Sequence, residues 1–174
     1  MRRVTGFVTS AAFVLLAFVV LQAQARPDFS GQWTLDPASA PAPAGGAGGG
    51  GGRGGRGGGG GAGFGQAFTA AQTADALTIT RMQGDQTVTL TYKLDGSEST
   101  NSVPGRGGAP QDQVSKAAWE GSKLAITTTL NFGGNSIEQK RVLSMEGSDL
   151  VIEQTNPGRD GGAPTTVRLV YKKG

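Results

Sequence analysis

Polar and apolar residues alternate without a break along Thr87-Val88-Thr89-Leu90-Thr91-Tyr92-Lys93-Leu94. In an extended chain successive side chains point to opposite faces, so residues two apart share a face. One face therefore carries Val88, Leu90, Tyr92 and Leu94, and the other carries the threonines with Lys93. The stretch predicts a β-strand with one buried side and one solvent-facing side.

The same period of two recurs elsewhere in the chain. It runs from Leu124 to Phe132 and from Val167 to Tyr171, and turn-forming residues such as Gly121-Ser122 separate the segments. The pattern predicts eight or nine strands, at residues 30–36, 76–82, 86–94, 97–103, 112–120, 123–132, 136–145, 149–155 and 165–173. One short helical piece is expected at Ala67–Asp75.

Short turns between consecutive strands predict an antiparallel meander, because parallel pairing would need long crossover connections. Eight or nine strands, each with one apolar face, close most simply into an up-and-down barrel. An open β-sandwich is the alternative. In both cases the fold class is all-β.

The N-terminal segment has the features of an export signal. Met1-Arg2-Arg3 is positively charged, Ala11–Leu21 is an unbroken apolar run, and Ala23-Gln24-Ala25 offers small residues for signal peptidase. The apolar run is about half of the roughly 20 residues that a membrane-spanning helix needs. We expect residues 1–25 to be a cleaved signal peptide. Residues 26–174 are then expected to form a single domain, periplasmic or secreted, with no membrane span.

A glycine-rich insertion interrupts the domain after the first strand. Residues 37–65 consist almost wholly of Pro, Ala and Gly, and glycine loses the most backbone entropy on ordering. With so few side chains to bury, the insertion is predicted to be disordered. The Arg-Gly-Gly pattern around Arg53 and Arg56 resembles RNA-binding segments, but an exported chain leaves the RNA of the cytoplasm behind.

Composition excludes several functions. Two of the 16 Lys and Arg residues lie in the export signal, and the remaining 14 nearly balance 13 Asp and Glu, too little charge to attract nucleic acid or a membrane. The lack of His and Cys removes the usual nucleophilic triads, histidine acid–base catalysis and most transition-metal sites. The carboxylates of the predicted strands read as solvent-facing: Glu98, Glu120, Glu138 and Glu153. We expect no enzyme activity, no metal and no cofactor.

Gly31-Gln32-Trp33 opens the first predicted strand and resembles the G-x-W signature of lipocalin and calycin barrels. The segments DFSGQWTLD at 28–36, TYKLDGSES at 91–99 and AAWEGSKLAITTT at 117–129 look like a group of lipocalin-like exported bacterial proteins of uncharacterised function. The resemblance implies that Gly31 and Trp33 close the barrel floor. Arg168 is the expected cation over the indole ring, with Lys172 as the alternative. Without that role, Trp33 is a large core residue of an edge strand.

Lipocalin-like proteins bind small apolar molecules inside the barrel, so the resemblance implies a small apolar or amphiphilic ligand. The expected ligand contacts are inward-facing residues: Leu90, Tyr92, Ile126, Phe132, Arg141 and Leu169. The R-x-Y pair of fatty-acid-binding relatives is absent, because Arg168 and Tyr171 are three apart and face opposite ways. An inward Arg141 would indicate an anionic or polar ligand, whereas a local bulge would return it to solvent.

A second function stays open. A barrel of this size can be filled by its own side chains, and the protein is then a structural or interaction module of the cell envelope with a protein partner. The aromatic content of 6% favours this alternative, since ligand pockets usually have aromatic walls. A cavity of about 300 Å³ or more would favour ligand binding instead.

Overall fold

The structure, a computed structural model, describes residues 26–40, 63–105, 109–132, 135–158 and 162–174. At Asn131, Phe132 and Asn135 it describes the backbone alone. The expected signal peptide at 1–25 and most of the expected disordered insertion at 37–65 therefore lie outside the described residues. Within these ranges no helix is long and apolar enough to cross a membrane.

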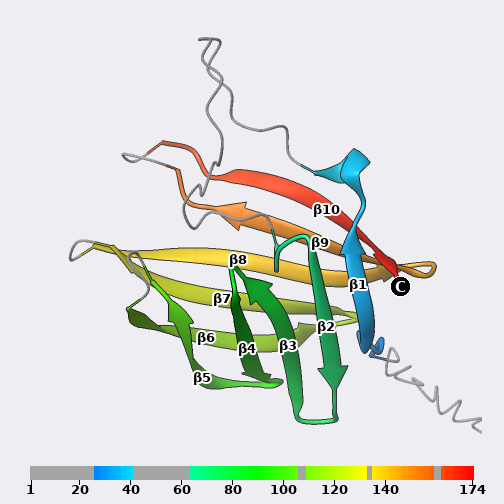
Figure 1. Ribbon diagram of the computed structural model, residues 1–174, viewed down its shortest axis with the longest axis horizontal. Helices are drawn as coiled ribbons and strands as arrows, with labels where there is room; N and C mark the ends of the chain where they lie inside the picture. Colours follow the sequence, from blue (N-terminus) through cyan, green and yellow to red (C-terminus); the bar gives the residue numbers. More distant parts are fainter. Residues whose placement is uncertain (1–25, 41–62, 106–108, 133–134, 159–161) are drawn as a thin grey trace, which may run out of the picture.

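The described part of the chain forms ten strands in one antiparallel sheet. In chain order they are β1 (Gly31–Leu35), β2 (Ala67–Gln72), β3 (Ala76–Gln83), β4 (Gln86–Lys93), β5 (Asp95–Pro104), β6 (Pro110–Glu120), β7 (Lys123–Phe132), β8 (Asn135–Glu146), β9 (Asp149–Asn156) and β10 (Thr165–Lys173). Sequential strands are neighbours in the sheet, except that β5 does not pair with β4 and β1 pairs with β10. Figure 1 shows β1–β4 crossing in front of β6–β9, so the sheet wraps around one interior.

This architecture confirms the predicted all-β up-and-down meander. The barrel is nearly closed, because β1 pairs with β10 while the two edge strands, β4 and β5, follow each other without a ladder of backbone hydrogen bonds. Two-residue turns fix the register of the hairpins. At Gly121 and Gly147 the backbone has φ of 65° and 63°, a conformation that glycine adopts without strain.

The segment expected to be helical is a strand. In β2, Phe68 and Ala70 are buried while Ala67, Thr69 and Ala71 are exposed, which is the alternation of a half-buried strand. Alanine favours a helix by local propensity, but pairing with β1 and β3 on both sides overrides it. This extra strand brings the total in the described residues to ten, against the eight or nine expected.

Trp33 lies in the core beneath a lysine from the last strand. Its side chain is 1% exposed, and Lys173, its partner across β1 and β10, places Nζ 5.7 Å from the centroid of the Trp33 ring. Gly31 leaves room for this lysine, because a Cβ at that position would lie 2.8 Å from Lys173 Cε. The backbone at Gly31 also has φ of 145°, a conformation that residues with a side chain rarely adopt, so glycine is favoured at this position.

The cation over Trp33 is not the one expected. Arg168 is exposed and its Nη2 lies 2.6 Å from Glu146 Oε2. The alternative, Lys172, is also exposed and pairs with Asp149. Both residues sit at even positions of β10, and the inward face of that strand takes the odd ones.

Both ends of the glycine-rich insertion are ordered where the structure describes them. Pro37–Ser39 form one turn of 3-10 helix, which Asp36 caps by accepting a hydrogen bond from the N–H of Ala38 at 2.9 Å. At the other end Gly63 and Phe64 are buried. The disorder expected for 37–65 does not extend to these ends, because each finds partners in the barrel.

Candidate functional site

The interior changes from apolar to polar across neighbouring layers of side chains. On strands β7–β10, residues in register form an apolar layer of Leu124, Leu143, Ile152 and Leu169. The next layer holds Ile126, Arg141, Gln154 and Val167, and the one beyond it holds Thr128, Gln139 and Asn156. The barrel therefore has an apolar end and a hydrogen-bonding end.

Arg141 lies in the middle layer and faces the interior. Its register neighbours are Ile126 on β7 and Gln154 on β9, and neither ladder contains a bulge at this point. Its Nε donates to Gln154 Oε1 at 3.2 Å, and its guanidinium carbon lies 5.4 Å from the centroid of the Phe64 ring. Burial lowers the pKa of Arg141, and the neighbouring charge of Arg81 also acts to lower it. The alternative of a bulge that returns Arg141 to solvent is therefore wrong.

A second arginine faces the same interior. Arg81 on β3 lies in register with the buried residues Phe68 and Val88. Its Nη2 donates to Gln83 Oε1 at 3.0 Å, while its Nε is buried without a hydrogen-bond partner. Burial lowers the pKa of this guanidinium as well.

Neither arginine pairs with a carboxylate among the described residues. The ion pairs among the described residues join exposed or half-exposed side chains on the outer surface, such as Lys116 with Glu98. Two like charges inside a protein are unfavourable when nothing of opposite charge lies between them. Arg81 and Arg141 are half-buried, and together they give the interior a positive charge that no carboxylate among the described residues compensates.

The interior amides form a network beside Arg141. Asn156 Oδ1 accepts hydrogen bonds from Gln139 Nε2 at 2.6 Å and from Gln154 Nε2 at 2.9 Å. These bonds orient Gln154 so that its Oε1 is directed to the guanidinium. The network positions polar acceptors without neutralising the charge of Arg141.

The ring of Phe64 fills the space in front of Arg141. Phe64 is 1% exposed although it lies before the start of β2. Its ring centroid lies 5.2 Å from that of Phe68, edge to face, and 6.2 Å from that of Tyr92. Although the sequence has few aromatic residues, an aromatic wall is assembled around one residue of the glycine-rich insertion.

The backbone on both sides of Phe64 bonds to interior side chains. The N–H of Gly63 donates to Gln154 Oε1 at 2.8 Å. The hydroxyl of Tyr171 donates to the carbonyl oxygen of Gly65 at 2.9 Å. This three-residue segment thus occupies hydrogen-bonding positions of the interior as well as apolar space.

Both tyrosines of the chain lie in this interior. Burial raises the pKa of Tyr171 to about 12 and also raises the pKa of Tyr92. The positive charges of Arg141 and Arg81 act in the opposite direction on both phenols. Near neutral pH both side chains are uncharged hydroxyl groups that can donate a hydrogen bond.

The structure brings five of the six expected ligand contacts to the interior: Leu90, Tyr92, Ile126, Arg141 and Leu169. The side chain of Phe132 lies outside the described residues, and the role of all six as ligand contacts stays a prediction. The sequence interpretation missed Arg81 and Phe64. Arg81 could be found by continuing the alternation of Leu77 and Ile79. Phe64 lies in a glycine-rich segment and carries no periodic signal.

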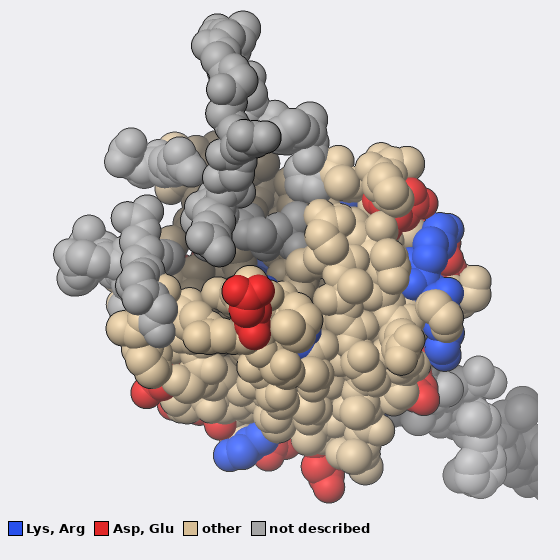
Figure 2. Space-filling model, viewed as in Figure 1, with Lys and Arg blue, Asp and Glu red and all other residues tan. Residues whose placement is uncertain are grey.

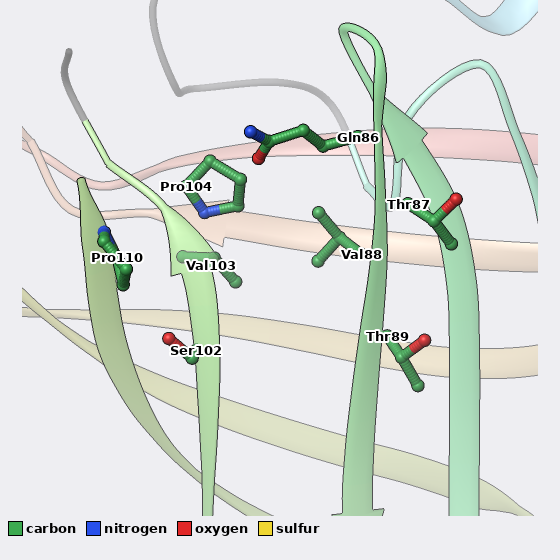
Figure 3. A pocket seen from close by; sticks show the side chains of 8 residues that line it. All are labelled: Gln86, Thr87, Val88, Thr89, Ser102, Val103, Pro104 and Pro110. Atoms are coloured by element: carbon green, nitrogen blue, oxygen red, sulfur yellow. The ribbon is translucent and has the colours of Figure 1, made fainter. Parts of the chain in front are cut away.

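Two small clefts lie in the described part of the barrel, and the arginines line neither of them. The larger, of about 210 Å³, follows the seam between β4 and β5, where Val88 and Val103 point toward each other (Figure 3). The other, of about 100 Å³, lies near Glu98 and Glu138. Both are smaller than the roughly 300 Å³ of a typical ligand pocket. In this conformation the space beside Arg141 is occupied by Phe64.

Charged side chains of both signs lie around the rim of the face shown in Figure 2, and an acidic side chain also lies near its centre among uncharged residues. Within the described ranges, no three acidic side chains gather where they could hold a metal ion. Arg81 and Arg141 remain the charged side chains of the interior for which the described residues show no ion pair.

No protein-family model matches the sequence, and no curated protein matches it. Among solved structures, the chain is similar to zebrafish ileal bile acid-binding protein complexed with cholic acid, with a TM-score of 0.44 and 21% sequence identity over 62% of this chain and 72% of that one. It is also similar to a mutant of the fluorescent protein UnaG, with a TM-score of 0.44 and 17% identity over 62% of this chain and 70% of that one. At these scores neither neighbour's ligand transfers to this chain.

Proposed function

We propose that the protein is an exported binding protein whose barrel holds a small amphiphilic molecule, and that Arg81 and Arg141 hold its anionic group. The observation that carries the proposal is the pair of interior guanidinium groups with no carboxylate partner among the described residues. The charged and apolar segments within residues 1–25 support export.

A buried positive charge is unfavourable unless an opposite charge or several hydrogen bonds compensate it. Arg141 has one hydrogen bond, to Gln154, and the face of the Phe64 ring. A carboxylate, sulfonate or phosphate could accept two parallel hydrogen bonds from the planar guanidinium fork. An anion at this point would compensate Arg141 and Arg81 together.

The polarity of the interior indicates that the rest of the ligand is apolar. Beyond Arg141, the layer of Leu124, Leu143, Ile152 and Leu169 offers no hydrogen-bonding group. An amphiphile with its anionic group at the arginines and its apolar body toward this layer would match both ends.

A second function is favoured by a different observation, the filled interior. Phe64, Phe68 and Tyr92 pack together where a ligand would lie, and the prominent clefts are small. On that basis the protein would be an envelope interaction module in which Phe64 and the interior amides are the permanent partners of Arg141.

Binding of cis-parinaric acid, a fluorescent fatty acid, and of its uncharged methyl ester distinguishes the two functions. We expect the acid to bind at one site, and Arg141→Gln to weaken it by about tenfold or more, because a charge-assisted hydrogen bond contributes about 1.5–3 kcal/mol. The same substitution should leave binding of the ester nearly unchanged.

Arg168→Gln is the matched control, because Arg168 is an exposed arginine on the outer surface. It should leave the affinity for the acid unchanged. If neither probe binds, or if Arg141→Gln and Arg168→Gln weaken the acid equally, the proposed function is wrong and the interaction module is the better account.

A further inference from the structure

We infer that Gly63-Phe64-Gly65 is an internal plug, which occupies the binding site in the absence of ligand and leaves it when an anionic amphiphile binds. The inference rests on the proposed function and names its regulation. It follows from what the segment contacts and from the space that its glycines leave.

The ring of Phe64 takes the position of a ligand relative to Arg141. Its centroid lies 5.4 Å from the guanidinium carbon, the separation of a cation–π contact. The same ring packs edge to face on Phe68 and tilted against Tyr92. An amphiphile whose anionic group bonded to the N–H groups of Arg141 would carry its apolar body into the space that the Phe64 ring fills, so occupation by one excludes the other.

The backbone of the plug forms hydrogen bonds with polar side chains of the interior, as the polar part of a ligand would. Gly63 donates its N–H to Gln154 Oε1, the same oxygen that accepts from Arg141 Nε. The carbonyl oxygen of Gly65 accepts a hydrogen bond from the hydroxyl of Tyr171. The plug thus combines an aromatic body, one acceptor and one donor, and bonds to the interior groups that a bound amphiphile would meet.

The glycines on both sides of Phe64 are required by the fit. Gly63 has φ of 59°, and a Cβ there would lie 2.9 Å from Leu169 Cδ1 and closer still to the Tyr171 hydroxyl. Gly65 has φ of 106°, which a residue with a side chain rarely adopts. The segment enters the barrel because its flanking residues have no side chains, and the same property lets it leave without displacing a strand.

The binding of cis-parinaric acid to Phe64→Ala and to Phe29→Ala tests the plug. Phe29 is the matched control, since it is a fully buried phenylalanine that also precedes a strand but stacks on Trp119 and not on Arg141. We expect Phe64→Ala to bind the acid about tenfold more tightly than the unaltered protein, and Phe29→Ala to show no gain. Adding Arg141→Gln to Phe64→Ala should remove most of the gain.

A second readout follows the movement itself. The chain contains no cysteine, so Phe64→Cys introduces a single thiol at the plug. We expect cis-parinaric acid to increase the rate at which a thiol reagent modifies it, while the buried control Ile79→Cys stays protected.

The outcomes separate the two proposals. If the unaltered protein binds the acid in an Arg141-dependent way, but Phe64→Ala binds no more tightly or the introduced thiol becomes less reactive with the acid present, the plug is refuted and the binding function stands. A gain of the same size in Phe29→Ala also refutes the plug, because any enlarged core would then suffice. If neither the unaltered protein nor Phe64→Ala binds the acid, both proposals fall.

Discussion

The side-chain amide of Asn101 on β5 pairs with both backbone polar groups of Thr91 on β4. The N–H of Thr91 donates to Asn101 Oδ1 at 2.7 Å, and Asn101 Nδ2 donates to the carbonyl oxygen of Thr91 at 3.1 Å. Ser99 accepts a further bond, from the N–H of Lys93 at 2.9 Å. Side chains thus take the place of a backbone ladder along the one stretch of the barrel where consecutive strands do not pair in the described residues.

Asn101→Ala should destabilise the barrel at this seam. The substitution leaves the N–H and the carbonyl group of Thr91 without their partner, and each unsatisfied group costs about 1–3 kcal/mol when buried from water. Because Thr91 is exposed, we expect a total loss of about 1–3 kcal/mol in the free energy of unfolding, measured by urea denaturation. Thr100→Ala, at an exposed neighbouring position, should change it by less than about 0.5 kcal/mol. Equal losses at the two positions would show that the amide does not fasten the seam.

A comparison of Gly63→Ala with Gly84→Ala distinguishes the cost of backbone strain from the cost of steric overlap at the plug. Both glycines have positive φ, 59° and 62°, so both substitutions carry the left-handed penalty of about 1–2 kcal/mol. A Cβ at Gly84 meets nothing within 4 Å, whereas at Gly63 it meets Leu169 and Tyr171. We expect Gly63→Ala to lower the free energy of unfolding by about 1–3 kcal/mol more than Gly84→Ala does, as measured by thermal or urea unfolding. If the two variants lose the same stability, the plug is not closely fitted in solution.

Lys173, and not Arg168, should be coupled energetically to Trp33. Lys173→Met keeps the aliphatic stem but removes the charge that lies over the ring. In a double-mutant cycle with Trp33→Phe we expect a coupling free energy of about 0.5–1 kcal/mol, the range of an exposed cation–π contact. The parallel cycle with Arg168→Met should give a value near zero, since Arg168 pairs with Glu146 on the outer surface. Coupling to Arg168 of the same size would contradict the structure.

Stability should fall in alkaline solution because of Tyr171. Its pKa is raised to about 12 in the folded protein, while an unfolded tyrosine ionises near 10. Between these values the unfolded chain loses a proton that the native state keeps, so this contribution to stability is full below about pH 10 and is lost as the pH approaches about 12. Urea unfolding across this window should show a steeper decline for the unaltered protein than for Tyr171→Phe. The chain contains two tyrosines, whose ionisation can be followed by the absorbance of phenolate in the folded protein. If both tyrosines ionise with a midpoint near pH 10, the prediction is wrong.

Much of the barrel follows from local patterns. Val88, Leu90, Tyr92 and Leu94 face inward because their spacing alone assigns them to one side of an extended chain, and all four are buried. The same rule puts Arg141 on the face of β8 that carries Leu143, and it would have put Arg81 on the inward face had the alternation of β3 been continued. These placements depend on one strand at a time, so the sequence suffices for them.

The sequence by itself determined an all-β meander and the faces of its main strands, because a period of two is a property of the local backbone. Tertiary structure alone decided that Ala67–Gln72 is a strand, that Lys173 lies over Trp33, and that Phe64 enters the barrel beside Arg141. Each of these depends on which distant segments become neighbours when the sheet closes. Closure of the sheet brings together residues that are far apart in the chain, and the alternation within a single strand carries no information about such contacts.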